Sequence, residues 1–405
     1  MNRRLSLRPA LRNAVATSGG VLVETGLRIV YLIFIARYVS LADYGLWAYG
    51  AASYGLALGM IVLGFDFLIS RRIGGGEQNV DGFLAATLSV RLVMLAIATL
   101  GFAALAFLVE PAGPARWVIL ALIPAMVGRG VGLWALNCFV AFEKAHEYLP
   151  VTLMLRAGEA ALGIAILLFG GGITEVILNH VAFRIVEGVA GYLLVRRKLT
   201  PIQPRWNDQV RGVLRESAPL GANGLLVQWL MLSPLVLLRL SGQDLATLGV
   251  LGLSLNLTLI LITVANGFLA ALVPSLSREG GGAAYANIVA LSALLMSFIL
   301  AAIAWAIASD VAALVVGEAF RRSGELMTPL AIVAGLAVAA AGFLQSLTIK
   351  GRVGYAMIAN GGGAVSLTVL MSPMTDWWGV SGGVGALAIS FAIRFCLAFG
   401  LSLRG

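Results

Sequence analysis

Long apolar stretches alternate with short polar links along the whole chain, and this pattern predicts membrane-spanning helices. A helix rises about 1.5 Å per residue, so about 20 apolar residues match a hydrocarbon core of about 30 Å. The opening stretch, 17–72, holds two such runs joined by a polar link at 37–43. We place twelve spans, at 18–39, 44–70, 82–109, 116–141, 148–170, 173–195, 217–240, 246–274, 284–308, 327–349, 353–371 and 381–403.

Composition agrees with this pattern. Hydrophobic residues make up 60% of the chain and charged residues only 12%, whereas soluble domains carry about 25% charged residues. Transmembrane barrels show alternating segments of about ten residues rather than continuous apolar runs. We therefore predict an all-α polytopic membrane protein.

Basic residues set the predicted orientation. The links on the side of the N-terminus carry seventeen of the 28 Lys and Arg, and the opposite links carry four, Arg37, Arg116, Arg321 and Arg322. Because Lys and Arg concentrate in cytoplasmic loops, both termini are predicted to be cytoplasmic. The same rule accounts for the net charge of +9 without a nucleic-acid partner.

One basic segment, 196–216 (RRKLTPIQPRWNDQVRGVLRE), divides the spans six and six. We expect an N-terminal lobe at 1–195, a cytoplasmic linker at 196–216 and a C-terminal lobe at 217–405. The linker is interpreted as a simple connection, the alternative being a surface-lying amphipathic helix with Trp206 at the headgroup level.

A weak repeat supports two lobes. The opening hairpin and the segment after the linker share an Arg, an Asp and a Gly in the same order, at Arg37, Asp43 and Gly45 and at Arg239, Asp244 and Gly249. With an even number of spans each, the two halves would have the same orientation.

Motifs for catalysis are not found. His146 and His180 lie far apart without metal-ligand spacing, and the chain contains neither a P-loop nor a Gly-x-Ser-x-Gly elbow. Both cysteines, Cys138 and Cys396, lie in apolar runs. We predict that the protein is not an enzyme and needs no metal or cofactor.

Ionisable residues inside the spans are the candidate functional groups. Each costs at least about 2.5 kcal/mol at the bilayer centre and usually faces a bundle interior or an aqueous cavity. Helical spacing pairs several of them, either as neutralised structural pairs or as parts of a site: Glu24 with Arg28, Arg156 with Glu159, His180 with Arg184, and Arg184 with Glu187.

Arginine exceeds acid among these groups, and a guanidinium binds phosphate in a forked geometry. This predicts an anionic, phosphate-bearing, amphipathic substrate. The predicted substrate-binding residues are Arg28, Arg91, Arg129, Arg156, Arg184 and Arg394. The predicted gate or ion-pair residues are Glu24, Asp66, Glu159, His180 and Glu187.

Four stretches resemble a known family. They are IARYVSLADYGLWAYGAASYG (35–55), RESAPLGANGLLVQW (215–229), LVPSLSR (272–278), and VVGEAFRRSGELMTPLAI (315–332) followed by KGRVGYAMIANGGG (350–363). They are similar to the polysaccharide transporters, the O-antigen (Wzx-type) flippases of the multidrug/oligosaccharidyl-lipid/polysaccharide exporter (MOP) superfamily. In one departure, MLSPLVLLRLS (231–241) lacks the acid often found in the family's seventh helix, so ion coupling there is not expected.

The resemblance implies twelve helices in two pseudo-repeated, MATE-like lobes around a central cavity. It implies a flippase that moves undecaprenyl-diphosphate-linked oligosaccharide from the cytoplasmic to the periplasmic leaflet of the bacterial inner membrane, for O-antigen, capsule or exopolysaccharide synthesis. Expected partners are the lipid-linked anionic oligosaccharide, the bilayer, a coupling proton or sodium ion, and glycan polymerase machinery. The alternatives are a lipid II flippase, a multidrug/cation antiporter and, in another class, a membrane-embedded glycan polymerase or transferase.

Overall fold

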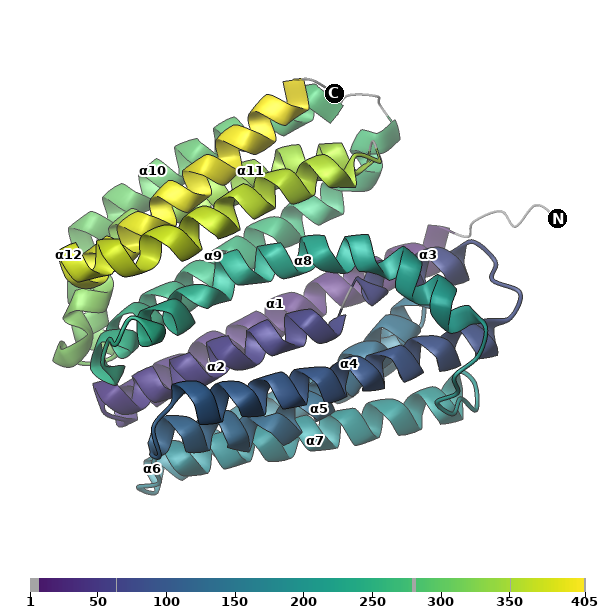
Figure 1. Cartoon of the computed structure of the whole chain (residues 1–405), viewed down its shortest axis with the longest axis horizontal. Coiled ribbons are helices and arrows are strands. Elements are labelled where there is room, and N and C mark those ends of the chain that lie inside the picture. Colours follow the sequence, from purple (N-terminus) through teal and green to yellow (C-terminus); the bar gives the residue numbers. More distant parts are fainter. Residues whose placement is uncertain (1–6, 63, 279–281, 350, 404–405) are drawn as a thin grey trace. The chain divides into compact units, whose positions relative to one another are not determined.

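A computed structural model of the whole chain describes residues 7–62, 64–278, 282–349 and 351–403 (Figure 1). The side chains of 7–18, 66, 268–278, 282–285 and 349 are not described. These described ranges contain α-helices and one short 3-10 helix, without β-strands. The predicted all-α class is therefore confirmed.

The helices follow one another with short links. Their bounds are α1 (Leu7–Tyr38), α2 (Leu41–Val62), α3 (Phe65–Gly74), α4 (Val80–Val109), α5 (Pro114–Ala141), α6 (Ala145–Leu168), α7 (Ile173–Lys198), α8 (Gln209–Leu240), α9 (Leu245–Arg278), α10 (Gly282–Val315), η1 (Glu318–Phe320), α11 (Arg321–Ile349) and α12 (Val353–Leu403). Within the described residues, eleven helical segments are long and apolar enough to cross a membrane. The chain is a multi-pass membrane protein.

The helix α12 is a hairpin of two arms. Gly379 leaves the helical conformation at φ 60°, and Gly382 packs so closely on the carbonyl of Met374 that a Cβ would not fit. Further along the arms, Gly363 lies against Arg394 and Ser390, so the arms are antiparallel. The predicted spans 353–371 and 381–403 lie on separate arms, which explains why the predicted twelve spans are close to the eleven segments observed.

Two helix bounds differ from prediction. The predicted span 44–70 is divided into α2 and α3 at Gly64, which has φ 69° and whose Cα packs against Leu220. The helix α8 begins at Gln209, and Val210 and Val213 on its first turns are buried in an apolar cluster of α3, α4 and α5. The last residues of the predicted linker thus belong to α8.

The chain forms two compact units. Unit 1 comprises 1–32 and 54–225, and unit 2 comprises 33–53 and 226–405. The end of α1 and the start of α2 thus belong with the C-terminal helices. The lobe boundaries expected from the linker stay a prediction.

In unit 1, glycines bring α5 and α7 into close contact. Gly128 lies directly against the backbone carbonyl of Arg184, and Gly188 against the backbone of Gly128, so a Cβ at either position would clash. Gly132, one turn after Gly128, lies against the side chain of Glu187. Small residues at this spacing let membrane helices approach closely, and here they place charged side chains of the two helices side by side.

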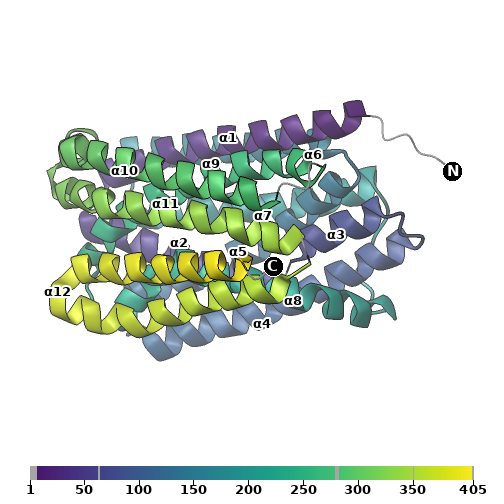
Figure 2. The ribbon, with the colours of Figure 1, turned by 90° about the horizontal axis from the view of Figure 1, so that it is seen from above.

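In unit 2, glycines of α11 pack against α10. Gly324, Gly335 and Gly342 contact Ala308, Ser297 and Val289 in turn, which is an antiparallel register. The two helices run side by side in both ribbon views (Figures 1 and 2).

Candidate functional site

A network of charged side chains lies inside unit 1. It joins α1, α5, α6 and α7, and its members are Glu24, Arg129, Arg156, Glu159, His180, Arg184 and Glu187. Seven of the eleven predicted site residues are therefore brought together.

Glu187 of α7 is the most buried carboxylate of this network, with 1% of its side chain exposed. It forms ion pairs with Arg129 of α5 and Arg156 of α6, and its Oε2 lies 3.1 Å from Nη1 of Arg184. One carboxylate thus connects three helices.

Arg156 and Glu159 extend the network across α6. Arg156 Nε lies 3.1 Å from Glu24 Oε1 of α1, and its Nη1 lies 3.0 Å from Glu159 Oε2. Glu159 also contacts Arg184 at 3.3 Å and Nδ1 of His180 at 2.6 Å. Arg156 is therefore shared by three carboxylates from three helices.

The charges of the network balance. In the ion pairs described for these helices, three arginines face three glutamates. Tyr54 of α2 packs edge-on against the imidazole of His180, with ring centroids 5.6 Å apart. Side-chain exposure rises from 1% at Glu187 to 36% at Glu24, so the network reaches the surface of unit 1 at α1.

The other predicted arginines lie elsewhere. Arg91 of α4 is fully buried, donates a hydrogen bond of 2.9 Å to the carbonyl of Gly130 and lies over the ring of Phe65. Arg394, in unit 2, is also buried, and its Nε donates to Oδ1 of Asn360 at 2.7 Å. Both arginines thus contact neutral groups, and their role in substrate binding stays a prediction.

Two further predicted residues stay untested. Arg28 lies one turn after Glu24 on α1 with an exposed side chain. Asp66 lies on α3, and its side chain is outside the described residues.

Helical spacing predicted part of the network correctly. The pairs Arg156–Glu159 and Arg184–Glu187, each three residues apart, are confirmed. The contact between Arg129 and Glu187 spans two helices and was missed. A sequence signal for it exists, because Gly128 and Gly132 flank Arg129 at the small-residue spacing that marks a close helix contact.

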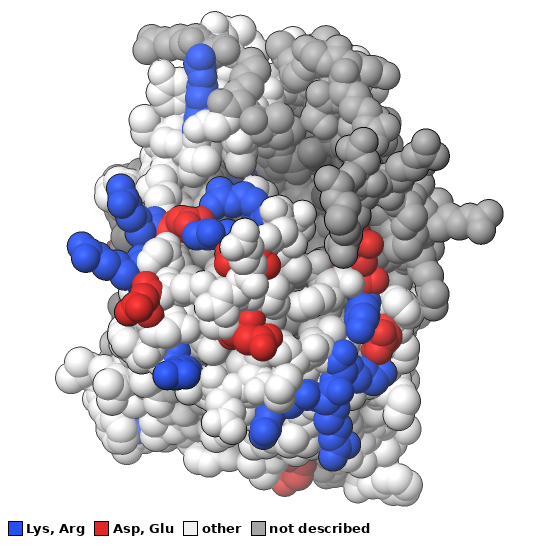
Figure 3. Space-filling model, turned by 90° about the vertical axis from the view of Figure 1, so that its right-hand side faces the viewer, with Lys and Arg blue, Asp and Glu red and all other residues white. Residues whose placement is uncertain are grey.

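A second group of ion pairs lies at the end of unit 1 that carries α3 and the start of α8. Arg71 and Arg72 of α3 both pair with Glu216 of α8, and Arg72 also contacts Glu77 at 3.3 Å. Figure 3 faces the right-hand end of Figure 1, where α3 and the start of α8 lie, and shows basic and acidic side chains next to each other. Because these groups are exposed, each pair contributes about 0–1 kcal/mol.

No group of three metal-ligating side chains is found among the described residues. The guanidinium groups of the network are of a kind that binds anions through charge-assisted hydrogen bonds.

Comparisons with known proteins agree on the fold. The model of the family described as "Polysaccharide biosynthesis protein" matches residues 10–279. No curated protein matches the chain in sequence.

Among solved structures, the lipid II flippase MurJ in its inward closed conformation is similar, with a TM-score of 0.71 and 10% identity over 98% of this chain and 88% of that one. An inward-facing multidrug resistance MATE family transporter of the MOP superfamily has a TM-score of 0.67 and 15% identity, over 94% of each chain. The MATE multidrug transporter DinF-BH has a TM-score of 0.64 and 18% identity, over 100% of this chain and 97% of that one. The expected MATE-like fold is confirmed.

Proposed function

The chain belongs to the polysaccharide biosynthesis protein family, and we propose that it acts there as a flippase for a lipid-linked oligosaccharide. Its substrate is an undecaprenyl-diphosphate-linked oligosaccharide, moved from the cytoplasmic to the periplasmic leaflet of the bacterial inner membrane. Both termini are cytoplasmic in this proposal.

The observation that carries the proposal is the arginine-glutamate network of unit 1. Three guanidinium groups gathered inside a membrane bundle are costly unless they have a ligand or counter-charge. A diphosphate offers acceptor oxygens of the same kind as a carboxylate, and it replaces Glu24 and Glu159 as the partner of Arg156. Glu187 stays in place and holds Arg129 and Arg184 toward the bound diphosphate.

His180 is the proposed site for a coupling proton. Its Nδ1 lies 2.6 Å from the carboxylate of Glu159, which is shared with two arginines. Protonation strengthens the bond between His180 and Glu159, and this frees Arg156 and Arg184 for the diphosphate.

The alternatives predict other features. A multidrug/cation antiporter needs carboxylates for its cation, whereas the glutamates of this network are paired with arginine. A lipid II flippase would use the same diphosphate chemistry with another sugar. A glycan polymerase or transferase would form new glycosidic bonds.

The test is a flipping assay on the full chain in proteoliposomes. We expect R129Q, R156Q and R184Q each to slow the transfer of a diphosphate-linked oligosaccharide at least tenfold, since each loses a charge-assisted contact with the diphosphate. The matched control is R197Q, because Arg197 is an exposed residue at the cytoplasmic end of the same helix α7.

Transfer rates of the three variants equal to that of R197Q would contradict the proposal. Faster transfer of lipid II than of other diphosphate-linked sugars would favour the lipid II alternative. Net synthesis of longer glycan by the purified protein would favour the enzyme.

A further inference from the structure

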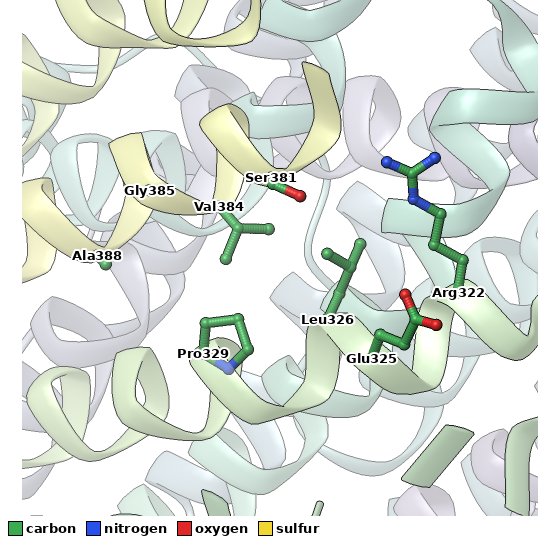
Figure 4. A pocket seen from close by; sticks show the side chains of 8 residues that line it. All are labelled: Arg322, Glu325, Leu326, Pro329, Ser381, Val384, Gly385 and Ala388. Atoms are coloured by element: carbon green, nitrogen blue, oxygen red, sulfur yellow. The ribbon is translucent and has the colours of Figure 1, made fainter. Parts of the chain in front are cut away.

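A cavity opens between α11 and the second arm of α12 in unit 2. Its volume is about 570 Å³, and it is lined by Arg322, Glu325, Leu326, Pro329, Ser381, Val384, Gly385 and Ala388 (Figure 4). One side is apolar and the other carries a cation, an anion and a hydroxyl group. This combination suits an amphipathic ligand.

The three polar groups of this cavity are open to a ligand. Arg322, Glu325 and Ser381 are all exposed, and among the described residues none of them has a hydrogen bond or an ion pair. Figure 4 shows the hydroxyl of Ser381 pointing from α12 toward the side where Arg322 and Glu325 lie.

The neighbouring residue Arg321 differs from Arg322 because it has acidic partners. Arg321 lies 2.5 Å from Glu318 and 2.6 Å from Asp310, so its charge is already compensated. Arg322 keeps a full positive charge next to the cavity. Glu325 follows one helical turn later on α11, so the cavity rim carries both a positive and a negative side chain.

Tryptophan places the cavity at the level of lipid headgroups. Trp377 and Trp378 precede Ser381 by a few residues and are 72% and 59% exposed. Exposed tryptophan in a membrane protein is typical of the membrane–water interface. Below the polar rim, the apolar wall of Leu326, Val384 and Ala388 continues along both helices.

We propose that this cavity binds a zwitterionic phospholipid that carries a phosphate and a primary ammonium group. The phosphate accepts hydrogen bonds from Arg322 and Ser381, and the ammonium donates to Glu325. An acyl chain lies along the apolar wall. By the predicted orientation, the lipid belongs to the periplasmic leaflet, and this assignment is independent of which substrate the protein transports.

The experiment measures lipid binding to the delipidated full chain in detergent by native mass spectrometry. The probes are dioleoyl phosphatidylethanolamine, phosphatidylcholine and phosphatidylglycerol, together with soluble phosphoethanolamine. We expect phosphatidylethanolamine to bind about three- to tenfold more tightly than the other two lipids. Phosphatidylcholine lacks ammonium N–H groups, and phosphatidylglycerol is repelled by Glu325.

Variants separate the two charges. R322Q should weaken all three lipids about three- to tenfold, whereas E325Q should reduce the preference for phosphatidylethanolamine over both other lipids. The control is R321Q, which removes the same charge one residue away and should leave the binding preference unchanged. Retention on size-exclusion chromatography confirms that each variant is folded.

Three results would overturn the proposal. The first is equal binding of the three lipids by the unaltered protein. The second is an equal effect of R322Q and R321Q. The third is binding of soluble phosphoethanolamine as tight as that of the complete lipid, because the apolar wall would then contribute nothing.

Discussion

Glu187 connects three arginines although its own side chain is almost fully buried. At the scale of single residues, this carboxylate keeps α5, α6 and α7 together and prevents their positive charges from repelling one another. Glu24 likewise compensates the charge of Arg156 at the exposed edge of the same network. The two acids therefore differ in how much each supports the fold.

We predict that E187Q destabilises the protein far more than E24Q. Removing one partner from a buried ion pair costs about 3–5 kcal/mol, whereas a partly exposed pair contributes about 1 kcal/mol or less. Thermal unfolding of the purified variants in one detergent measures the difference. The double variant R129Q/E187Q should lose less than the sum of its single changes, because the two groups share one contact. Equal losses for E187Q and E24Q would show that Glu187 is not a structural centre.

Asp244 caps the first turn of α9. The backbone N–H of Thr247 donates to Oδ1 of Asp244 at 2.7 Å, and this bond holds the pKa of Asp244 below its usual value. The bond stabilises the folded state above the usual pKa, and the stabilisation is lost as the pH falls through the lowered value.

We therefore predict that D244A lowers stability by about 1 kcal/mol at neutral pH. Below the lowered pKa, the unaltered protein has lost the same contribution, so the difference should shrink. Thermal unfolding at neutral and strongly acidic pH measures this change. A difference that grows as the pH falls would contradict the assignment.

At the scale of helices, the contact between α5 and α7 decides where the charged groups meet. Gly128 and Gly188 leave room for backbone against backbone, and the charges on the next residues, Arg129 and Glu187, come within ion-pair distance. The network therefore depends on residues that carry no charge.

We predict that G128V disrupts both stability and transport. A side chain at this position must displace the backbone of α7 at Arg184, and such overpacking costs about 1–3 kcal/mol. Thermal unfolding and the flipping assay measure the two effects. The control is G101V on α4, because nothing lies within 4 Å of a Cβ added at Gly101. A G128V protein as stable and active as G101V would exclude a tight α5–α7 contact.

Most helices could be predicted from the sequence, because the length of an apolar run depends only on the thickness of the bilayer. Pairs within one helix, such as Arg156 and Glu159, followed from the helical repeat. Packing between helices could not be read in this way. The sequence alone does not show that α8 begins early on the buried side chains of Val210 and Val213, or that Arg91 turns to a carbonyl of α5.

At the scale of the whole molecule, the internal repeat has a structural counterpart. Gly45 and Gly249 hold the same position in the two halves, and in unit 2 they pack against each other's helices: Gly45 on the carbonyl of Leu245, and Gly249 on that of Leu41. The α1–α2 hairpin and the α8–α9 hairpin thus contact each other through residues at equivalent positions of the repeat. This reciprocity agrees with two halves of the same orientation.

We predict that both termini lie in the cytoplasm. Green fluorescent protein fused after Gly405 should fluoresce, and alkaline phosphatase fused there should be inactive. A phosphatase fusion after Gly242, in the link between α8 and α9, should be active because this link is predicted to be periplasmic. The opposite activities would reverse the orientation.

The order in which the network is synthesised has a consequence for how the protein enters the membrane. Glu24 leaves the ribosome first, Arg129 and Arg156 follow, and Glu187 comes last on α7. Until α7 arrives, Arg129 has only the more distant carboxylate of Glu24, at 3.9 Å, as a partner within the network. A nascent chain that ends after α6 contains the charged residues of α1, α5 and α6 but lacks Glu187, the central acid of the network. The first five spans are therefore expected to stay next to the insertion machinery until α7, the sixth span, is added.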